Sequence, residues 1–136
     1  MKKYFAASLA MWVLVLVWDN FLSGMFIGSA MSAIPGAVES FSKLYESLGD
    51  LFVALVFVAL YARTRSIFGE NPGGGATYGV YAGLLGNFPT WLFMTVYFGW
   101  PYKSAWTLTI AMVCLMTVCG AMVGAIYKAM GSPKAA

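Results

Sequence analysis

Four long apolar stretches take up most of this chain, and they limit what it can fold into more than any other feature. They cover residues 4–30, 37–67, 77–100 and 104–128. A helix needs about 20 mainly apolar residues to cross a bilayer, and each stretch is at least that long. Because 61% of the residues are hydrophobic and only 10% are charged, little is left for a soluble domain. We therefore expect an all-α polytopic membrane protein, a four-helix bundle that forms a single domain over residues 1–136.

The breaks between these stretches predict the orientation of the chain. The segment "ENPGGG" at residues 70–75 is typical of a loop, and "PYK" at 101–103 turns the chain again. Cytoplasmic loops are enriched in Lys and Arg. With both termini cytoplasmic, six of the eight basic residues lie on that side: Lys2, Lys3, Arg63, Arg65, Lys128 and Lys134. We expect this topology, with Lys43 and Lys103 on the outer side.

The absence of histidine limits the chemistry that the chain can perform. Haem, chlorophyll-type, zinc and di-iron sites in helical bundles depend largely on imidazole ligands. Cys114 and Cys119 point about 140° apart on one helix, so they cannot pair with each other. We expect no metal, no catalytic residue and no cofactor, although a bound lipid is compatible with the composition. The basic residues form no run dense enough for nucleic acid, which is not expected as a partner.

Three motifs give the chain a resemblance to known sequences. They are "FVALYAR" at residues 57–63, "GATYGVYAGLLGNFP" at 75–89 and "GAMVGAIYK" at 120–128, together with an acidic residue in the first apolar stretch. The pattern resembles a set of uncharacterised small four-helix integral membrane proteins of bacteria. This resemblance implies the four-crossing topology and a place in the bacterial inner (cytoplasmic) membrane, and it implies no activity or site residues.

Small residues recur at helical spacing in the last two stretches. Gly79 and Gly83 form one small-xxx-small ridge, and Gly120 and Gly124 form another. Such ridges let helix backbones approach closely in lipid, where no hydrophobic effect drives helices together. The two ridges lie at matching depth, so we expect the third and fourth helices to cross there. The ridges could alternatively form an interface with a second copy or with a partner subunit.

A few polar residues interrupt the apolar stretches and are the candidate site. Asp19 lies about 20 Å along the first helix from its inner end, and Asp50 lies about 20 Å along the second, so the two carboxyl groups share one level. If these helices face each other, like charges at short range would raise one pKa and allow a shared proton. Asn20 adjoins Asp19. Asn87 and Thr117, each about 15 Å from the inner side, are expected to form a hydrogen bond between the third and fourth helices.

These residues leave three interpretations of Asp19 open: a structural polar contact, a proton or cation site, or a contact with a partner subunit. The first functional hypothesis is a non-catalytic accessory or scaffold subunit that packs against a larger membrane complex or assembles with itself. The alternative is a small proton-coupled transporter that uses an intramembrane carboxylate. One acid in the first of four short helices resembles the small multidrug resistance pattern, but Asp19 replaces that family's glutamate and the connection at residues 32–48 is longer. An enzyme is not expected, because only Asp19, Glu46, Asp50 and tyrosines could act as acids or bases.

Overall fold

The computed structural model describes residues 1–34 and 43–131, and all regular structure within these ranges is helical. The first helix is continuous but has three parts: α1 (Lys2–Val17), a π-helical turn (Trp18–Leu22) and α2 (Ser23–Ser32). The others are α3 (Lys43–Phe68), α4 (Pro72–Phe98) and α5 (Tyr102–Ala129). An all-α fold with four long helices is therefore confirmed. The predicted start of the second helix at residue 37 lies outside the described residues.

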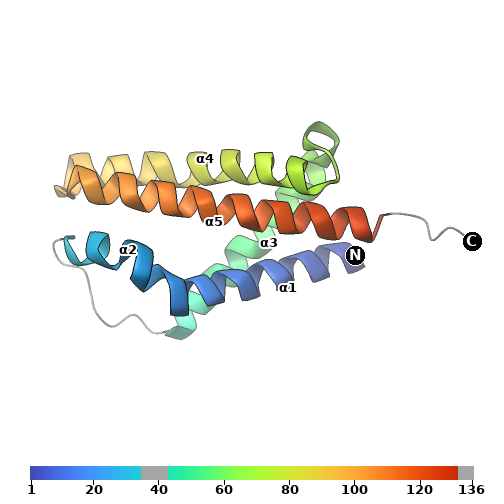
Figure 1. Ribbon diagram of the computed structural model, residues 1–136, viewed down its shortest axis with the longest axis horizontal. Helices are drawn as coiled ribbons and strands as arrows, with labels where there is room; N and C mark the ends of the chain where they lie inside the picture. Colours follow the sequence, from blue (N-terminus) through green and yellow to red (C-terminus); the bar gives the residue numbers. More distant parts are fainter. Residues whose placement is uncertain (35–42, 132–136) are drawn as a thin grey trace, which may run out of the picture.

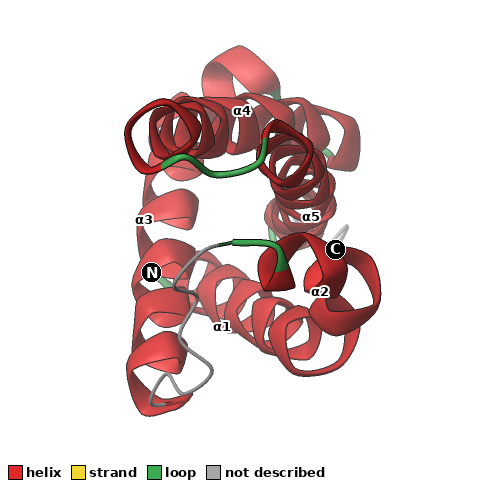
Figure 2. Cartoon of the chain, turned by 90° about the vertical axis from the view of Figure 1, so that its left-hand side faces the viewer, coloured by secondary structure: helices red, strands yellow, loops and turns green. Residues whose placement is uncertain are grey.

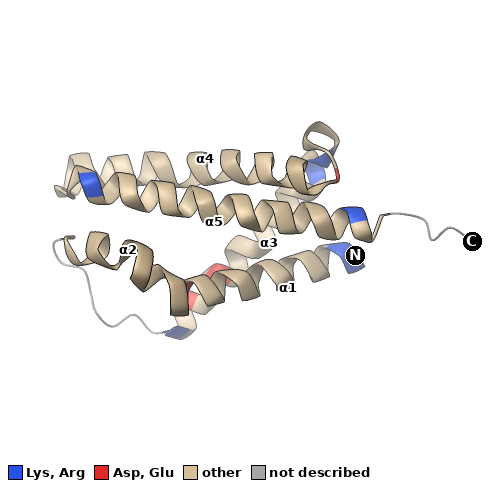
Figure 3. Ribbon diagram, viewed as in Figure 1, with Lys and Arg blue, Asp and Glu red and all other residues tan. Residues whose placement is uncertain are grey.

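The four helices pack as two unequal pairs (Figure 1). α4 and α5 lie side by side along their whole length, and α1 with α2 runs along the other side of α5. α3 is strongly inclined to the others and crosses behind α1, which the end view also shows (Figure 2). The N-terminus, the connection between α3 and α4 and the end of α5 lie at one end of the bundle. We refer to this end as the basic end, because Lys and Arg gather there (Figure 3).

The close pairing of α4 and α5 depends on glycines, as expected from the two ridges. A Cβ atom at Gly79 would overlap the Met116 carbonyl group and lie 2.8 Å from the Cα atom of Thr117. A Cβ atom at Gly120 would overlap the carbonyl group of Gly75 and lie 3.1 Å from the Cα atom of Gly79. The two backbones are therefore in direct contact, which only small residues permit.

This backbone contact between α4 and α5, which we call the α4–α5 seam, continues on both sides of Gly79 and Gly120. A Cβ atom at Gly83 would lie 2.9 Å from the Cα atom of Val113, and one at Gly124 would overlap the backbone of Asn71. All four predicted ridge glycines thus pack within one chain.

The predicted loop at residues 70–75 is only partly correct, because α4 already begins at Pro72. Asn71 caps the helix: its side-chain oxygen accepts a hydrogen bond from the Gly74 amide at 2.9 Å. Proline suits the first helical position, where its missing amide hydrogen would have no partner. Gly75 lies against Gly120 of α5, so the last glycine of this run lets the two helices approach closely.

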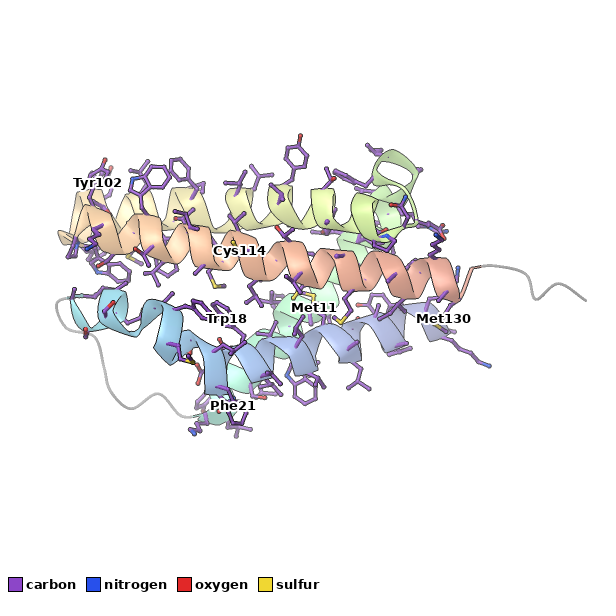
Figure 4. All side chains as sticks on the ribbon, in the orientation of Figure 1. Met11, Trp18, Phe21, Tyr102, Cys114 and Met130 are labelled. Atoms are coloured by element: carbon purple, nitrogen blue, oxygen red, sulfur yellow. The ribbon has the colours of Figure 1, made fainter. Side chains whose placement is uncertain are left out.

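Aromatic side chains with polar tips attach α3 to its neighbours. The Tyr4 hydroxyl donates to the Leu55 carbonyl at 2.9 Å, and the Trp12 indole donates to the Ser47 carbonyl at 3.1 Å. From α4, the Tyr78 hydroxyl donates to the Phe57 carbonyl at 3.0 Å in a buried position. Around these bonds lies the core between α1, α3, α4 and α5, whose fully buried side chains include Met11, Val58, Tyr61, Cys119 and Val123. Figure 4 labels Met11 in this core. Cys114 is exposed and Cys119 buried, and both are free, as their spacing predicted.

Within residues 1–34 and 43–131, three helices are long and apolar enough to cross a membrane: Lys2–Ser32, Lys43–Phe68 and Tyr102–Ala129. α4 is as long as its neighbours but is not among them, because Gly, Tyr, Thr, Asn and Pro lower the mean hydropathy of its sequence. Length and composition thus support membrane association for the chain.

Candidate functional site

Asp19 lies in the π-helical turn Trp18–Leu22, where the first helix widens. A π-turn accommodates one extra residue and changes the backbone hydrogen bonds of the surrounding turns. Two side chains bind carbonyl groups at this point. The Asn20 amide donates to the Leu16 carbonyl at 2.8 Å, and the Ser23 hydroxyl donates to the Asp19 carbonyl at 2.8 Å. The exposed Asn20 side chain therefore makes its hydrogen bond within its own helix and not with a neighbouring helix.

The structure brings Asp19 together with Asp50, the pair whose common depth the sequence indicated. Their carboxyl groups are near enough to interact with each other and with Glu46 electrostatically. One oxygen of Asp50 is buried and has no hydrogen-bond partner among the described residues. Two adjacent carboxylates repel each other, so a shared proton or an added hydrogen-bond donor would lower the energy of the pair.

A cavity of about 330 Å³ opens beside Asp19 and Glu46. Its walls come from α2, α3, α4 and α5 and are mainly apolar: Ile27, Met31, Trp91, Leu108 and Met112 line it, with Ser23, Gly24 and Gly28. The indole N–H of Trp91 is buried without a hydrogen-bond partner in the described part of the chain. In Figure 4, Trp18 points from the π-turn toward α5, whereas Phe21 points away from the bundle. The cavity thus combines carboxyl groups with a hydrophobic wall.

A second cavity, of about 320 Å³, lies between α3 and α4, where the two helices diverge; we call it the α3–α4 groove. Its lining residues are Phe52, Val53, Val56, Phe57, Leu60, Tyr78, Ala82, Gly86, Asn87, Met112 and Met116. All but two of these side chains are apolar or glycine, and the exceptions are Tyr78 and Asn87. Met112 lines both cavities, so the groove and the carboxyl cavity are neighbours across this one side chain of α5.

The predicted hydrogen bond between Asn87 and Thr117 is not formed. The Asn87 amide donates to the Gly83 carbonyl at 2.9 Å, and the Thr117 hydroxyl donates to the Val113 carbonyl at 2.7 Å. Both partners lie four residues back on the same helix, and such a local bond needs no second helix. Asn87 therefore faces the α3–α4 groove, while Thr117 remains a local feature of α5.

Sequence reasoning missed a polar cluster at the basic end. Arg65 donates to Glu70 at 2.6 Å, and the ammonium group of Lys3 lies 3.8 Å from the same carboxylate. The side chains of Lys3 and Arg65 both lie 5.9 Å from the ring centre of Tyr127. In the sequence, Lys3 and Arg65 indicate only the orientation of the chain. The five-residue spacing of Arg65 and Glu70 across a helix end could have indicated the pair.

The described part of the chain defines a class: an all-α fold in which three helices are long and apolar enough to cross a membrane. Carboxyl groups of the first two of these helices lie near each other. Among residues 1–34 and 43–131, no group of three or more His, Cys, Asp or Glu side chains is placed to hold a metal ion. Comparison of the chain with protein-family models, with curated proteins and with solved structures finds no match in any of the three.

Proposed function

We propose that this chain is a small integral membrane protein that acts as a non-catalytic accessory or scaffold subunit. In this proposal it crosses a bacterial inner membrane four times, with α4 crossing beside α5 and the basic end in the cytoplasm. It packs against a larger membrane complex or against further copies of itself. The enrichment of cytoplasmic loops in Lys and Arg supports the orientation.

The α3–α4 groove is the observation that carries this proposal. α4 and α5 are in backbone contact, yet α3 inclines away from α4 and leaves an apolar groove of about 320 Å³. In lipid, helices associate through close packing and polar contacts rather than through the hydrophobic effect. An added helix would find both in the groove, since the glycine Gly86 and the amide of Asn87 lie on its α4 wall.

Site-specific photo-crosslinking in native membranes tests the accessory role. A photoreactive residue at Val56 would lie in the groove, whereas the same residue at Leu9 of α1 provides a lipid-exposed control outside it. We expect a defined crosslinked product from Val56 and none from Leu9. Its mass distinguishes a second copy from a different subunit. A monomeric protein in mild detergent that gives no product from Val56 would refute the proposal.

A proton-coupled transporter is the second candidate, and the proximity of Asp19 and Asp50 specifically favours it. Carboxyl groups inside a membrane are costly unless compensated, and they often belong to proton relays. The cavity beside them supplies an apolar wall for a hydrophobic substrate. Proton flux in reconstituted vesicles is the test. A flux that Asp19→Asn abolishes while the protein remains folded would place transport ahead of the accessory role.

A further inference from the structure

A cavity of about 630 Å³ lies at the basic end, where the ends of α1, α3 and α5 meet. Lys2, Lys3 and Tyr4 of α1 line it, together with Arg65 of α3, Tyr127 of α5 and Met130. Figure 3 shows that Lys and Arg positions of separate helices gather at this end. The cavity is thus an opening between helix ends with cationic walls.

The charge within this cavity is not balanced. Three cationic side chains line it, and Glu70 is the carboxylate that pairs with Lys3 and Arg65. Lys2 is exposed and makes no ion pair or hydrogen bond with any described residue. Arg65 contacts Glu70 through one nitrogen, so its other donors remain available for a second oxyanion.

The position of the cavity selects the kind of anion. The apolar part of α1 begins directly after Lys3, and the side chains of Phe5 and Leu9 are 62% and 58% exposed. A phospholipid at this boundary would bring its phosphate to the level of the cationic side chains while its acyl chains cover Phe5 and Leu9. Basic cavities between helix ends on the cytoplasmic side are typical sites for anionic headgroups.

We propose that this cavity binds the phosphate of an anionic phospholipid. Lys2, Lys3 and Arg65 contact the phosphate oxygens. The Tyr127 ring, which is 96% buried, positions the Lys3 and Arg65 side chains through cation–π contacts. This site does not depend on the accessory or the transport role, because it needs only the basic end at a membrane surface.

Lipid titration of the purified full-length protein in a zwitterionic detergent tests the site. Phosphatidylglycerol, phosphatidylcholine and inorganic phosphate are added separately, and binding is followed by native mass spectrometry and by thermal unfolding. We expect binding and a raised unfolding temperature with phosphatidylglycerol only. An equal effect of phosphatidylcholine would refute the proposal, and an equal effect of inorganic phosphate would refute the lipid as the source of the anion.

Charge variants locate the site. Lys2→Gln removes a cation that makes no internal contact, so folding should be unaffected, and phosphatidylglycerol affinity should fall about fivefold at low ionic strength. Lys2→Gln with Lys3→Gln should lower it about 25-fold. Lys103→Gln, at the opposite end of α5, is the matched control and should bind like the parent. Equal losses in the Lys2 and Lys103 variants would show non-specific attraction and overturn the proposal.

Discussion

Replacing Gly79 by alanine tests the backbone contact between α4 and α5. The added Cβ atom would overlap the Met116 carbonyl group and approach the Cα atom of Thr117 to 2.8 Å. Since both obstacles are backbone, no side chain can rotate away, and the two helices must separate. Gly86 provides a matched control on the same helix, because a Cβ atom there would meet nothing within 4 Å.

The expected magnitude follows from comparing the two variants. Alanine is favoured over glycine in a helix by up to about 1 kcal/mol, and this gain applies to Gly79→Ala and Gly86→Ala alike. Overpacking a close contact costs about 1–3 kcal/mol, and only Gly79→Ala incurs it. The difference between the variants in free energy of unfolding therefore isolates the packing term, and we expect about 1–3 kcal/mol.

Equilibrium unfolding in mixed detergent micelles measures this difference, with helicity followed by circular dichroism. Gly86→Ala should be as stable as the parent or slightly more stable, and Gly79→Ala should be less stable than both. Bulkier changes at the same seam, Gly83→Leu and Gly120→Leu, should reduce stability further. If Gly79→Ala and Gly86→Ala unfold alike, α4 and α5 are not in backbone contact at Gly79, and the α4–α5 seam described above does not exist there.

Three further predictions concern single side chains. Asp19→Asn should preserve folding, whereas Asp19→Leu should destabilise by about 1–2 kcal/mol because a polar contact is lost, as chemical unfolding would measure. In a cysteine-free background, an impermeant thiol reagent added to intact cells should label Lys103→Cys and spare Ser66→Cys; the reverse pattern would invert the proposed topology. Tyr78→Phe removes a buried hydrogen bond to α3 and should lower the unfolding free energy by about 0.5–1.5 kcal/mol, whereas Tyr81→Phe, on an exposed side chain, should change it little.

Features that depend on regular helix geometry could be predicted from the sequence. The common depth of Asp19 and Asp50 follows from a rise of about 1.5 Å per residue, and the structure places the two carboxyl groups together. The glycine ridges follow from helical spacing in the same way. Both predictions use only residue number and the repeat of the helix, and the tertiary structure did not alter either.

Features set by competing local interactions could not be predicted. Asn87 binds a carbonyl group of its own helix, which a count of membrane depth cannot distinguish from a bond across helices. The glycines after Pro72 are typical of a loop, but Asn71 caps a helix there and Gly75 packs against α5, which the sequence pattern alone does not indicate. The inclination of α3 depends on which side chains of three neighbouring helices it meets. Because the α3–α4 groove results from this inclination, the sequence does not predict it either.

The π-turn at Trp18–Leu22 determines which residues of α2 face the rest of the bundle. Each residue of an α-helix advances about 100° around the axis, so the extra residue in the turn shifts the faces of everything that follows by about that angle. A helical wheel drawn through Lys2–Ser32 as one regular helix would therefore displace Ala30, which is buried, by about 100° from its true direction. A homologue with one residue fewer in this segment would have to carry its buried residues in α2 at positions displaced by one. An alignment without a gap there would misassign every residue of α2.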